Sequence, residues 1–411
     1  MKVLSLFMIN EGVLRLNWAK SHMFILNEIE NRFVKEKPFK NLKIGMALHV
    51  EAKTGVLALT LKSGGANVKL ASCNPLSSDD LVVNALKENI DVYARKGESD
   101  EEYYNNLNKV LDFEPDIIID DGGDLTYLIH KSKDFKVIGG NEETTTGVVR
   151  LKALEKKGVL KFPIFDVNDA KMKHLFDNRY GTGQSTIDGL MTATNLTLAG
   201  KNIVVAGYGW CGRGIANRLR GLGAKITVTE IDSVKAVEAH MDGFNVSTMI
   251  EAIKNADFVI TATGMKDVVR AEHLKVAKNG CILANAGHFD VEISKRDLEK
   301  MAVSKSNVRK SVDLYEFPDN RKIYLISEGR LVNLAAGQGH PVEIMDLSFS
   351  LQALTAEYVV KKRDTLKNRV YSVPEEIDEY VAEAALRNFN ISLDKLNDEQ
   401  KRYYEEWETG T

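Results

Sequence analysis

The chain has 411 residues, of which 44% are apolar and 27% charged, and its formal net charge is −3. This length is too great for a single hydrophobic core and predicts two domains with an appendage. The near-neutral charge gives no reason to expect nucleic acid as a partner, and no apolar run reaches the 18 residues of a membrane span.

Three scattered cysteines, Cys73, Cys211 and Cys281, form no CxxC pair. An odd number without spacing is typical of reduced thiols in a cytoplasmic protein, and we expect neither a disulfide framework nor a metal site.

The first part of the chain alternates helical and strand patterns. An amphipathic helix is predicted over residues 11–35, with Leu14, Trp18, Met23, Leu26 and Ile29 among its apolar positions. Strands follow at 42–49, 68–72, 92–95, 117–119 and 137–139, and helices at 54–61, 79–86, 100–111 and from 142 to about 156. This alternation predicts a parallel sheet covered by helices on both faces.

Polar residues stand where four of these strands end. They are His49, Ser72-Cys73-Asn74, Asp120-Asp121 and Glu142-Glu143. Because function gathers at the carboxyl ends of strands in open parallel sheets, the four strand ends predict a cleft.

Residues 202–232 predict a dinucleotide-binding unit. The apolar run 203–206 leads into Gly207-Tyr208-Gly209-Trp210-Cys211-Gly212, then come a helical pattern and a second strand that ends in Glu230. The glycines Gly207, Gly209 and Gly212 permit a tight turn, a close approach of a pyrophosphate and close packing of helix on strand. An acid at position 230 accepts hydrogen bonds from a ribose 2′-OH and repels a 2′-phosphate, which favours NAD over NADP.

These patterns divide the chain. We expect a substrate domain over residues 1–183, to which 341–370 return, a dinucleotide domain over 184–340 and a C-terminal oligomerisation tail over 371–411. The fold class is therefore α/β, with two doubly wound parallel-sheet domains and a short helical tail.

Several long strings resemble one family, the S-adenosylhomocysteine hydrolases, along nearly the whole chain. They are Leu48-His49, Ser72–Pro75, Lys96-Gly97-Glu98, Asp120–Thr126, Glu142–Gly147, Asn168-Asp169, Phe176–Asn178, Gly207–Gly212, Asn285–Val291, Glu328–Leu334 and Gly339–Pro341. The resemblance is to the shorter archaeal and thermophile-type branch.

The resemblance implies a hydrolysis that passes through a temporary oxidation. Tightly held NAD oxidises the ribose 3′-OH, the C4′ proton is removed, homocysteine leaves, water adds, and the ketone is reduced again. The family also implies one NAD per subunit and a homotetramer.

By resemblance, six residues are expected to be catalytic. They are His49, Asp121, Glu143, Lys173, Asp177 and His288. Lys173 would deprotonate the 3′-OH, for which a lysine needs a pKa lowered by a dry site. Asp121 matches the C4′ base, and the two histidines match an acid–base pair.

Further residues match binding positions. The substrate set is Glu51, Lys53, Thr54, Cys73, Asn74, His340 and Met345, and the cofactor set is Thr144, Thr145, Thr146, Asn178, Gly207, Gly209, Gly212, Glu230, Asn285, Ala286 and Asn333.

Lys53 departs from the family pattern, which usually has Glu or Gln there to read the purine 6-amino group. Lysine only donates hydrogen bonds, and a 6-oxo group accepts them. S-inosylhomocysteine is therefore an alternative substrate, unless Glu51 accepts from the 6-amino group while Lys53 donates to N1.

The C-terminus departs too: the sequence ends at Trp407-Glu408-Thr409-Gly410-Thr411, without the lysine and tyrosine with which many members complete a neighbour's NAD site. A catalytically silent NAD-binding relative and an ordinary NAD dehydrogenase are the competing hypotheses. The presence of all six acid–base residues argues against the silent relative.

Overall fold

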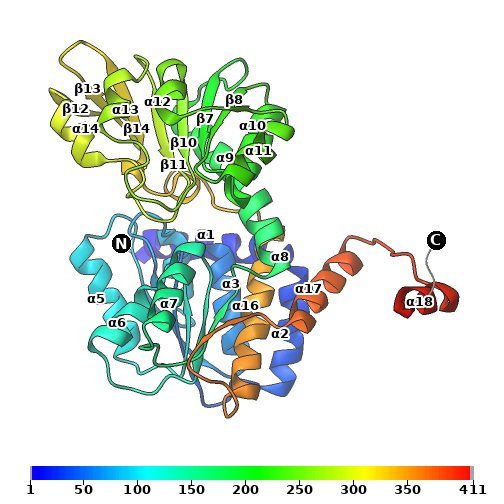
Figure 1. Cartoon of the computed structure of the whole chain (residues 1–411). Coiled ribbons are helices and arrows are strands. Elements are labelled where there is room, and N and C mark those ends of the chain that lie inside the picture. Colours follow the sequence, from blue (N-terminus) through cyan, green and yellow to red (C-terminus); the bar gives the residue numbers. More distant parts are fainter. Residues whose placement is uncertain (1, 408–411) are drawn as a thin grey trace.

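The computed structural model describes residues 2–407 and contains two α/β lobes, one above the other in Figure 1. The first lobe is built on a seven-stranded sheet with the order β15-β6-β5-β4-β1-β2-β3, in which all neighbours are parallel. Its strands are β1 (Lys43–Leu48), β2 (Asn67–Ser72), β3 (Asp91–Tyr93), β4 (Ile117–Asp120), β5 (Gly139–Glu142), β6 (Ile164–Asp166) and β15 (Val370–Ser372).

Helices cover both faces of this sheet, because successive strand residues point to opposite sides. Ile44, Met46 and Leu48 of β1 pack into one core and Ala47 into the other. The first core is closed by α1 (Lys2–Ser21), α2 (Phe24–Glu36), α3 (Ala52–Ser63), α4 (Asp80–Leu86), α16 (Val342–Lys362) and α17 (Glu375–Asn388), and the second by α5 (Asp100–Leu111), α6 (Asp124–Ser132) and α7 (Thr145–Lys156).

The second lobe contains an eight-stranded sheet with the order β12-β13-β14-β11-β10-β7-β8-β9. Its strands are β7 (Asn202–Ala206), β8 (Lys225–Thr229), β9 (Asn245–Val246), β10 (Phe258–Thr261), β11 (Ile282–Asn285), β12 (Ser304–Arg309), β13 (Val312–Glu316) and β14 (Lys322–Ile326). Strand β14 pairs in parallel with β11, and β13 and β12 then continue the sheet at this edge as an antiparallel meander that the sequence did not predict.

One core of this lobe is covered by α9 (Thr182–Thr194), α10 (Trp210–Gly221), α11 (Ser233–Met241) and α15 (Val332–Ala335), and the other by α12 (Met249–Ala252), η2 (Ile253–Asn255), α13 (Ala271–Val276) and α14 (Lys295–Met301). A short turn, η3 (Ser327–Gly329), follows β14.

Both sheets reverse their strand order near the middle. In the first lobe the reversal lies between β1 and β4, and in the second between β7 and β10. Ligands bind outside the carboxyl ends of strands at such a reversal. The two lobes are joined by α8 (Lys171–Lys173) and the π-helix η1 (His174–Gly181), and α16 carries the chain back into the first lobe.

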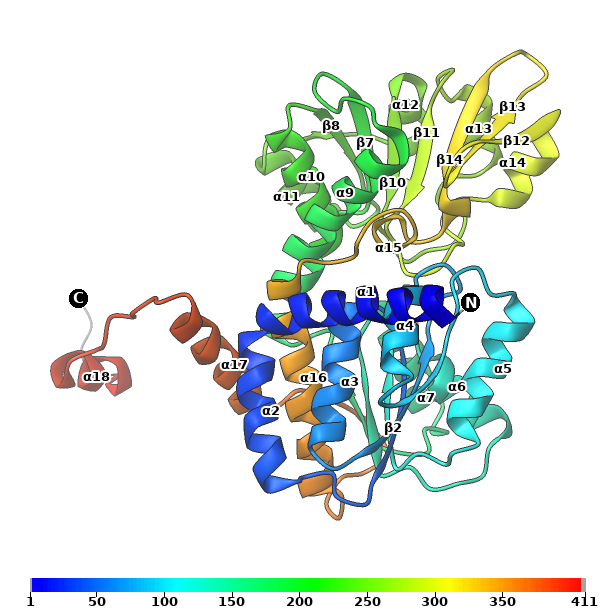
Figure 2. The same ribbon diagram turned by 180° about the vertical axis from the view of Figure 1, so that it is seen from behind.

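The predicted helix over 11–35 is two helices, α1 and α2, separated at His22-Met23. Ser21 Oγ donates back to Trp18 O, and Asp346 from α16 accepts from the N–H groups of Ile25 and Leu26, which caps a new helix. Leu14 and Trp18 are exposed on α1, which lies across the top of the first lobe in Figure 2.

The predicted strand at 137–139 is displaced to β5 (Gly139–Glu142), so the next helix begins at Thr145. Its glycines fill places where a side chain would collide: a Cβ on Gly140 would lie 2.5 Å from Ile118 Cγ1, and one on Gly139 2.8 Å from Val359 Cγ1. A strand that is buried because it contains glycines has few apolar side chains, so an apolar pattern in the sequence does not reveal it.

The expected tail boundary at 371 is wrong. β15 adds to the first sheet beside β6, and Ile377 and Val381 of α17 lie in the core of the first lobe. Residues 389–407, with α18 (Asp398–Glu405), project away from the lobe (Figure 1). Within residues 2–407, no helix has the length and apolar character needed to cross a membrane.

Candidate active site

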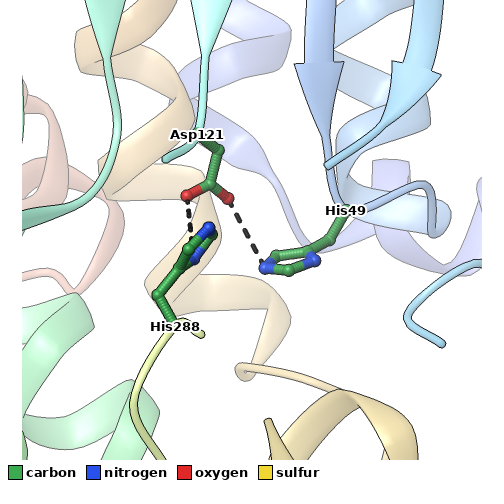
Figure 3. Close-up of side chains that lie close together, drawn as sticks. All are labelled: His49, Asp121 and His288. Atoms are coloured by element: carbon green, nitrogen blue, oxygen red, sulfur yellow. Dashed lines mark ion pairs between the residues drawn. The ribbon is translucent and has the colours of Figure 1, made fainter. Parts of the chain in front are cut away.

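Three titratable side chains meet between the lobes (Figure 3). His49 follows β1 and Asp121 follows β4, so they flank the order reversal of the first sheet, and His288 follows β11 of the second lobe. His49 Nε2 lies 3.5 Å from Asp121 Oδ2, and His288 Nδ1 lies 3.5 Å from Asp121 Oδ1. One carboxylate therefore contacts an imidazole from each lobe.

His49 is held from its other side as well. Its Nδ1 lies 2.7 Å from Ser77 Oγ and 3.3 Å from Cys73 Sγ, and that thiol lies 3.6 Å from Asp121 Oδ2. Burial lowers the pKa of His49 to about 4, against the opposing effect of Asp121. His49 is therefore a neutral imidazole near pH 7, able to accept a proton. The donor atoms of His49, Asp121 and His288 lie within 4.8 Å of one another, which is also the spacing of a metal-binding group.

A second buried cluster surrounds Lys173. Its Nζ donates to Asp177 Oδ1 at 3.0 Å and to Asn178 Oδ1 at 2.7 Å, and it lies 3.5 Å from Glu143 Oε1. The wider turn of the π-helix brings residues four and five positions later to the same ammonium group, and such segments recur at functional sites.

The predicted low pKa of Lys173 is not found. Burial acts to lower it, but Asp177 and Glu143 hold the pKa of Lys173 above its usual value. Burial acts to raise the pKa of Asp177, yet Lys173 and His340 hold it below its usual range. His340 Nδ1 lies 3.4 Å from Asp177 Oδ1, so His340 joins this cluster. The carboxylates of Asp177 and Glu143 therefore favour the charged ammonium form of Lys173.

Glu143 receives two hydrogen bonds from α16. Ser348 Oγ donates to its Oε1 at 2.6 Å, and Gln352 Nε2 donates to its Oε2 at 2.5 Å. Burial raises the pKa of Glu143, and Lys173 acts in the opposite direction. Ser348 and Gln352 were not among the residues predicted from the sequence, although their spacing of four residues places them on one helix face.

Lys53 lies at the start of α3 and is buried. Its Nζ lies 2.7 Å from Glu51 Oε2 and donates to Gln338 O at 3.0 Å. Glu51 is also the N-cap of α3, accepting from the N–H groups of Lys53 and Thr54, and Thr54 Oγ1 donates to His49 O at 2.6 Å. An ammonium group has three N–H bonds, so two partners leave Lys53 one donor for a ligand.

The glycine-rich turn in the second lobe has the geometry of a dinucleotide site. Gly207 has φ +94°, and a Cβ on Gly212 would lie 1.9 Å from Gly207 O. Gly209 is the N-cap of α10 without a side-chain cap, which leaves backbone N–H groups for an anion. Glu230 follows β8, and its carboxylate accepts from Tyr208 N at 2.6 Å and Ile231 N at 2.7 Å.

Comparison with known proteins decides the family. The family described as "S-adenosyl-L-homocysteine hydrolase" matches residues 1–138, and the family described as "S-adenosyl-L-homocysteine hydrolase, NAD binding domain" matches residues 178–339. The chain belongs to the S-adenosyl-L-homocysteine hydrolase family. It is therefore an NAD-dependent hydrolase, as the resemblance predicted.

Its relatives carry two names. The chain is 62% identical to the adenosylhomocysteinase of Thermoplasma volcanium, with 98% of this chain and 99% of the relative covered. It is 61% identical to that of Thermoplasma acidophilum, with 98% and 99% covered. It is also 56% identical to the S-inosyl-L-homocysteine hydrolase of Methanocaldococcus jannaschii, with 98% and 97% covered.

Other predicted residues serve the protein's own structure. Asn285 Nδ2 donates to the carbonyls of Gly287, Phe289 and Gly329, and its Oδ1 accepts from Gly287 N and Thr261 Oγ1. Asn285 thus fixes the loop that carries His288. Ala286 N donates to Thr261 O in the same loop.

The remaining predicted residues make local contacts. Asn74 Oδ1 accepts from Leu76 N, and Met345 is buried on α16. Thr144, Thr145 and Thr146 open α7 without a side-chain cap. Asn333 Nδ2 donates to Ser185 Oγ, and its buried Oδ1 has no partner within residues 2–407. An amide oxygen in that state is free to accept from a ligand.

Proposed function

We propose that the protein hydrolyses S-adenosyl-L-homocysteine to adenosine and L-homocysteine. The observation that carries this proposal is the position of Asp121, within 3.5 Å of His49 from its own lobe and of His288 from the other lobe. A carboxylate between two imidazoles provides a base and proton carriers at one place, as an elimination followed by a water addition requires.

The residues of the second lobe fit NAD. The crowded Gly207–Gly212 turn and the uncapped start of α10 would hold the pyrophosphate, and Glu230 would accept from a ribose hydroxyl. Thr144–Thr146, Asn178 and the free Oδ1 of Asn333 would contact the nicotinamide end. When bound, NAD supplies the hydride acceptor for the substrate's 3′ carbon and returns the hydride at the end of the cycle.

Lys173 would hold the ribose and manage its hydroxyl proton. The ammonium group donates to Asp177 and Asn178 and lies 3.5 Å from Glu143. Because Asp177 and Glu143 hold the pKa of Lys173 above its usual value, Lys173 would hold the 3′-OH as an ammonium donor, and the ionised Glu143 beside it would accept the hydroxyl proton. Asp177 would orient the ammonium group and His340 would orient Asp177.

His49, Asp121 and His288 would carry out the proton transfers of elimination and hydration. Asp121 would remove the C4′ proton. His49, whose pKa burial lowers to about 4, is neutral and would receive a proton from water, and His288 would deliver one to the leaving thiolate.

The purine would be read by Lys53 and its neighbours. The free N–H of Lys53 is a donor, and Gln338 O and Glu51 are acceptors beside it. Adenine fits this pair when Lys53 donates to N1 and an acceptor takes the 6-amino group. Hypoxanthine fits when Lys53 donates to O6 and an acceptor takes N1–H. Because Lys53 fits both bases, S-inosyl-L-homocysteine is a second candidate substrate.

A paired assay separates the candidates. The values of kcat/KM for the adenosine and inosine thioethers would be compared in the wild type and in Lys53→Gln. A mismatched buried polar group costs about 1–3 kcal/mol, so a preference of about tenfold or more is expected for one base. We expect the adenosine form to be preferred and Lys53→Gln to widen the preference. A wild-type preference for the inosine form would replace the first candidate by the second.

We also propose a cytoplasmic homotetramer. The absence of a paired cysteine framework in the sequence supports the location, and family membership supports the assembly. Light scattering of the holoenzyme would test the tetramer, which a monomer mass would exclude.

A further inference from the structure

Glu142 is a buried acid to which the proposed reaction gives no role. It is the last residue of β5, is 0% exposed and lies immediately before Glu143. Strand β5 pairs with β4 so that Glu142 lies opposite Asp120. Asp121 and Glu143 are the next residues after this last pair of β4 and β5. They therefore lie side by side just beyond the carboxyl ends of the two strands.

One carboxyl oxygen of Glu142 connects the loop after β4 with the loop after β5. Its Oε1 accepts from Gly122 N at 2.8 Å and from Thr144 N at 3.0 Å. Gly122 follows Asp121 and Thr144 follows Glu143, so the bridge fixes the backbone on the far side of both acids. Without this bridge, the N–H groups of Gly122 and Thr144 would each need another hydrogen-bond acceptor.

Gly147 provides the space for this carboxyl group. A Cβ on Gly147 would lie 2.1 Å from Glu142 Cδ, so the carboxyl group would have to move away. Gly122 is fixed from the opposite side, because it has φ +102° and its Cβ would lie 2.4 Å from His288 Nε2. The Glu142–Gly147 string therefore contains a carboxyl group and the cavity that receives it.

We propose that Glu142 is a positioning residue that acts as a neutral clamp, with its carboxyl oxygen holding Asp121 and Glu143 in their catalytic placement. This inference rests on the proposed function, since it takes Asp121 and Glu143 as the residues that meet the substrate.

The neutral state follows from the surroundings. Oε2 of Glu142 is buried and has no hydrogen-bond partner within residues 2–407. An ionised oxygen in that situation costs far more than a neutral one. Burial, Asp120 and Asp121 raise the pKa of Glu142 well above its usual value, while the N–H groups of Gly122 and Thr144 oppose the shift. A glutamine has the same shape as the protonated acid and the same accepting oxygen.

The test compares Glu142→Gln with Glu142→Asp. The glutamine variant is expected to keep kcat within about threefold of the wild type, because it retains the accepting oxygen. The aspartate is one methylene too short to reach both N–H groups. We expect kcat to fall about 100-fold, since a displacement of about 1 Å has that effect, while KM changes little because Glu142 does not touch the substrate.

Gly147→Ala tests the same clamp with Glu142 unchanged, by pushing its carboxyl group away, and should lower kcat as Glu142→Asp does. This variant also decides the matter if Glu142→Asp gives no folded protein. Asp116→Ala is the matched control: Asp116 accepts from Lys43 N at 2.8 Å at the amino ends of β4 and β1, the ends opposite to Asp121. It should lower Tm and leave kcat unchanged.

Two results would overturn the clamp. One is a loss in Glu142→Gln as large as in Glu142→Asp, which would mean that the charge matters. The other is full kcat in Glu142→Asp or Gly147→Ala. Wild-type enzyme assayed alongside distinguishes a failure of the clamp from a failure of the proposed function. Absence of homocysteine release by the wild type would refute the hydrolase proposal itself.

Discussion

The two lobes share the order of five strands, β5-β4-β1-β2-β3 in the first and β11-β10-β7-β8-β9 in the second, and differ in what lies at its reversal. In the first lobe, β1 and β4 are followed by His49 and Asp121, which can exchange protons. In the second lobe, β7 is followed by Gly207 and an uncapped helix start, which present backbone N–H groups. The same topology thus gives a centre for acid–base chemistry in one lobe and an anion-binding turn in the other. The residues of the loops determine which of the two is formed.

The largest expected effect is a loss of catalysis in a protein that still binds NAD. Asp121→Asn keeps the size of the side chain and removes the base between His49 and His288. General acid–base groups contribute about 10²–10⁴-fold, so kcat should fall by that factor. The NAD content of the purified protein should stay that of the wild type. Loss of NAD together with activity would contradict the separate roles of the two lobes.

The second prediction concerns the second lobe, where a substitution is expected to remove bound NAD. Gly212→Ala places a Cβ 1.9 Å from Gly207 O, so the turn must open. Bound NAD should be lost, activity should fall with it, and overpacking should lower the stability by about 1–3 kcal/mol. Gly221→Ala is the matched control in the same helix, because nothing lies within 4 Å of its Cβ. NAD content and thermal unfolding of both variants would be measured. Full NAD occupancy in Gly212→Ala would refute the assignment of the turn.

The sequence was sufficient for the framework of both lobes. Apolar strands such as β1 and β7 are visible because their residues are buried on both faces, and the glycine turn is visible because only glycine fits there. The strand β5 was misplaced, since its burial depends on Gly139 and Gly140 against Val359 and Ile118.

The partners of Glu143 were missed for a different reason. Ser348 and Gln352 stand 205 and 209 residues further along the chain, and no local pattern connects them to Glu143. A lowered pKa of Lys173 is what its role as a base, implied by the resemblance, would require, whereas Asp177 and Glu143 hold that pKa above its usual value. Ser348 and Gln352 contact Glu143 from a distant element, which spacing along a sequence does not report, whereas Asp177 stands only four residues after Lys173.

The smallest expected effect sharpens the role of Glu143. Removing a donor by Ser348→Ala takes away a bond that favours the charged form, so the pKa of Glu143 should rise further. A hydrogen bond to a charged group contributes about 1.5–3 kcal/mol, which corresponds to a shift of about one pH unit or more. Lys173, Asp177 and Asp121 also face this carboxylate and remain in the variant.

The measurement is the pH dependence of kcat/KM. If the ionised form of Glu143 is required, activity is lost as the pH falls through its pKa, and the acidic limb should move to higher pH in Ser348→Ala. Ser304→Ala is the control, because Ser304 donates to the exposed Glu316 in the second lobe. An unmoved acidic limb would mean that Glu143 does not titrate in the reaction.

The most direct test counts products in the wild-type holoenzyme. Purified protein with bound NAD is given S-adenosyl-L-homocysteine, and homocysteine and NADH are measured together. The proposed mechanism predicts many homocysteine molecules per active site with no net NADH. One NADH for every substrate consumed would instead identify a dehydrogenase, and bound NAD with no homocysteine from either nucleoside thioether would identify a silent relative.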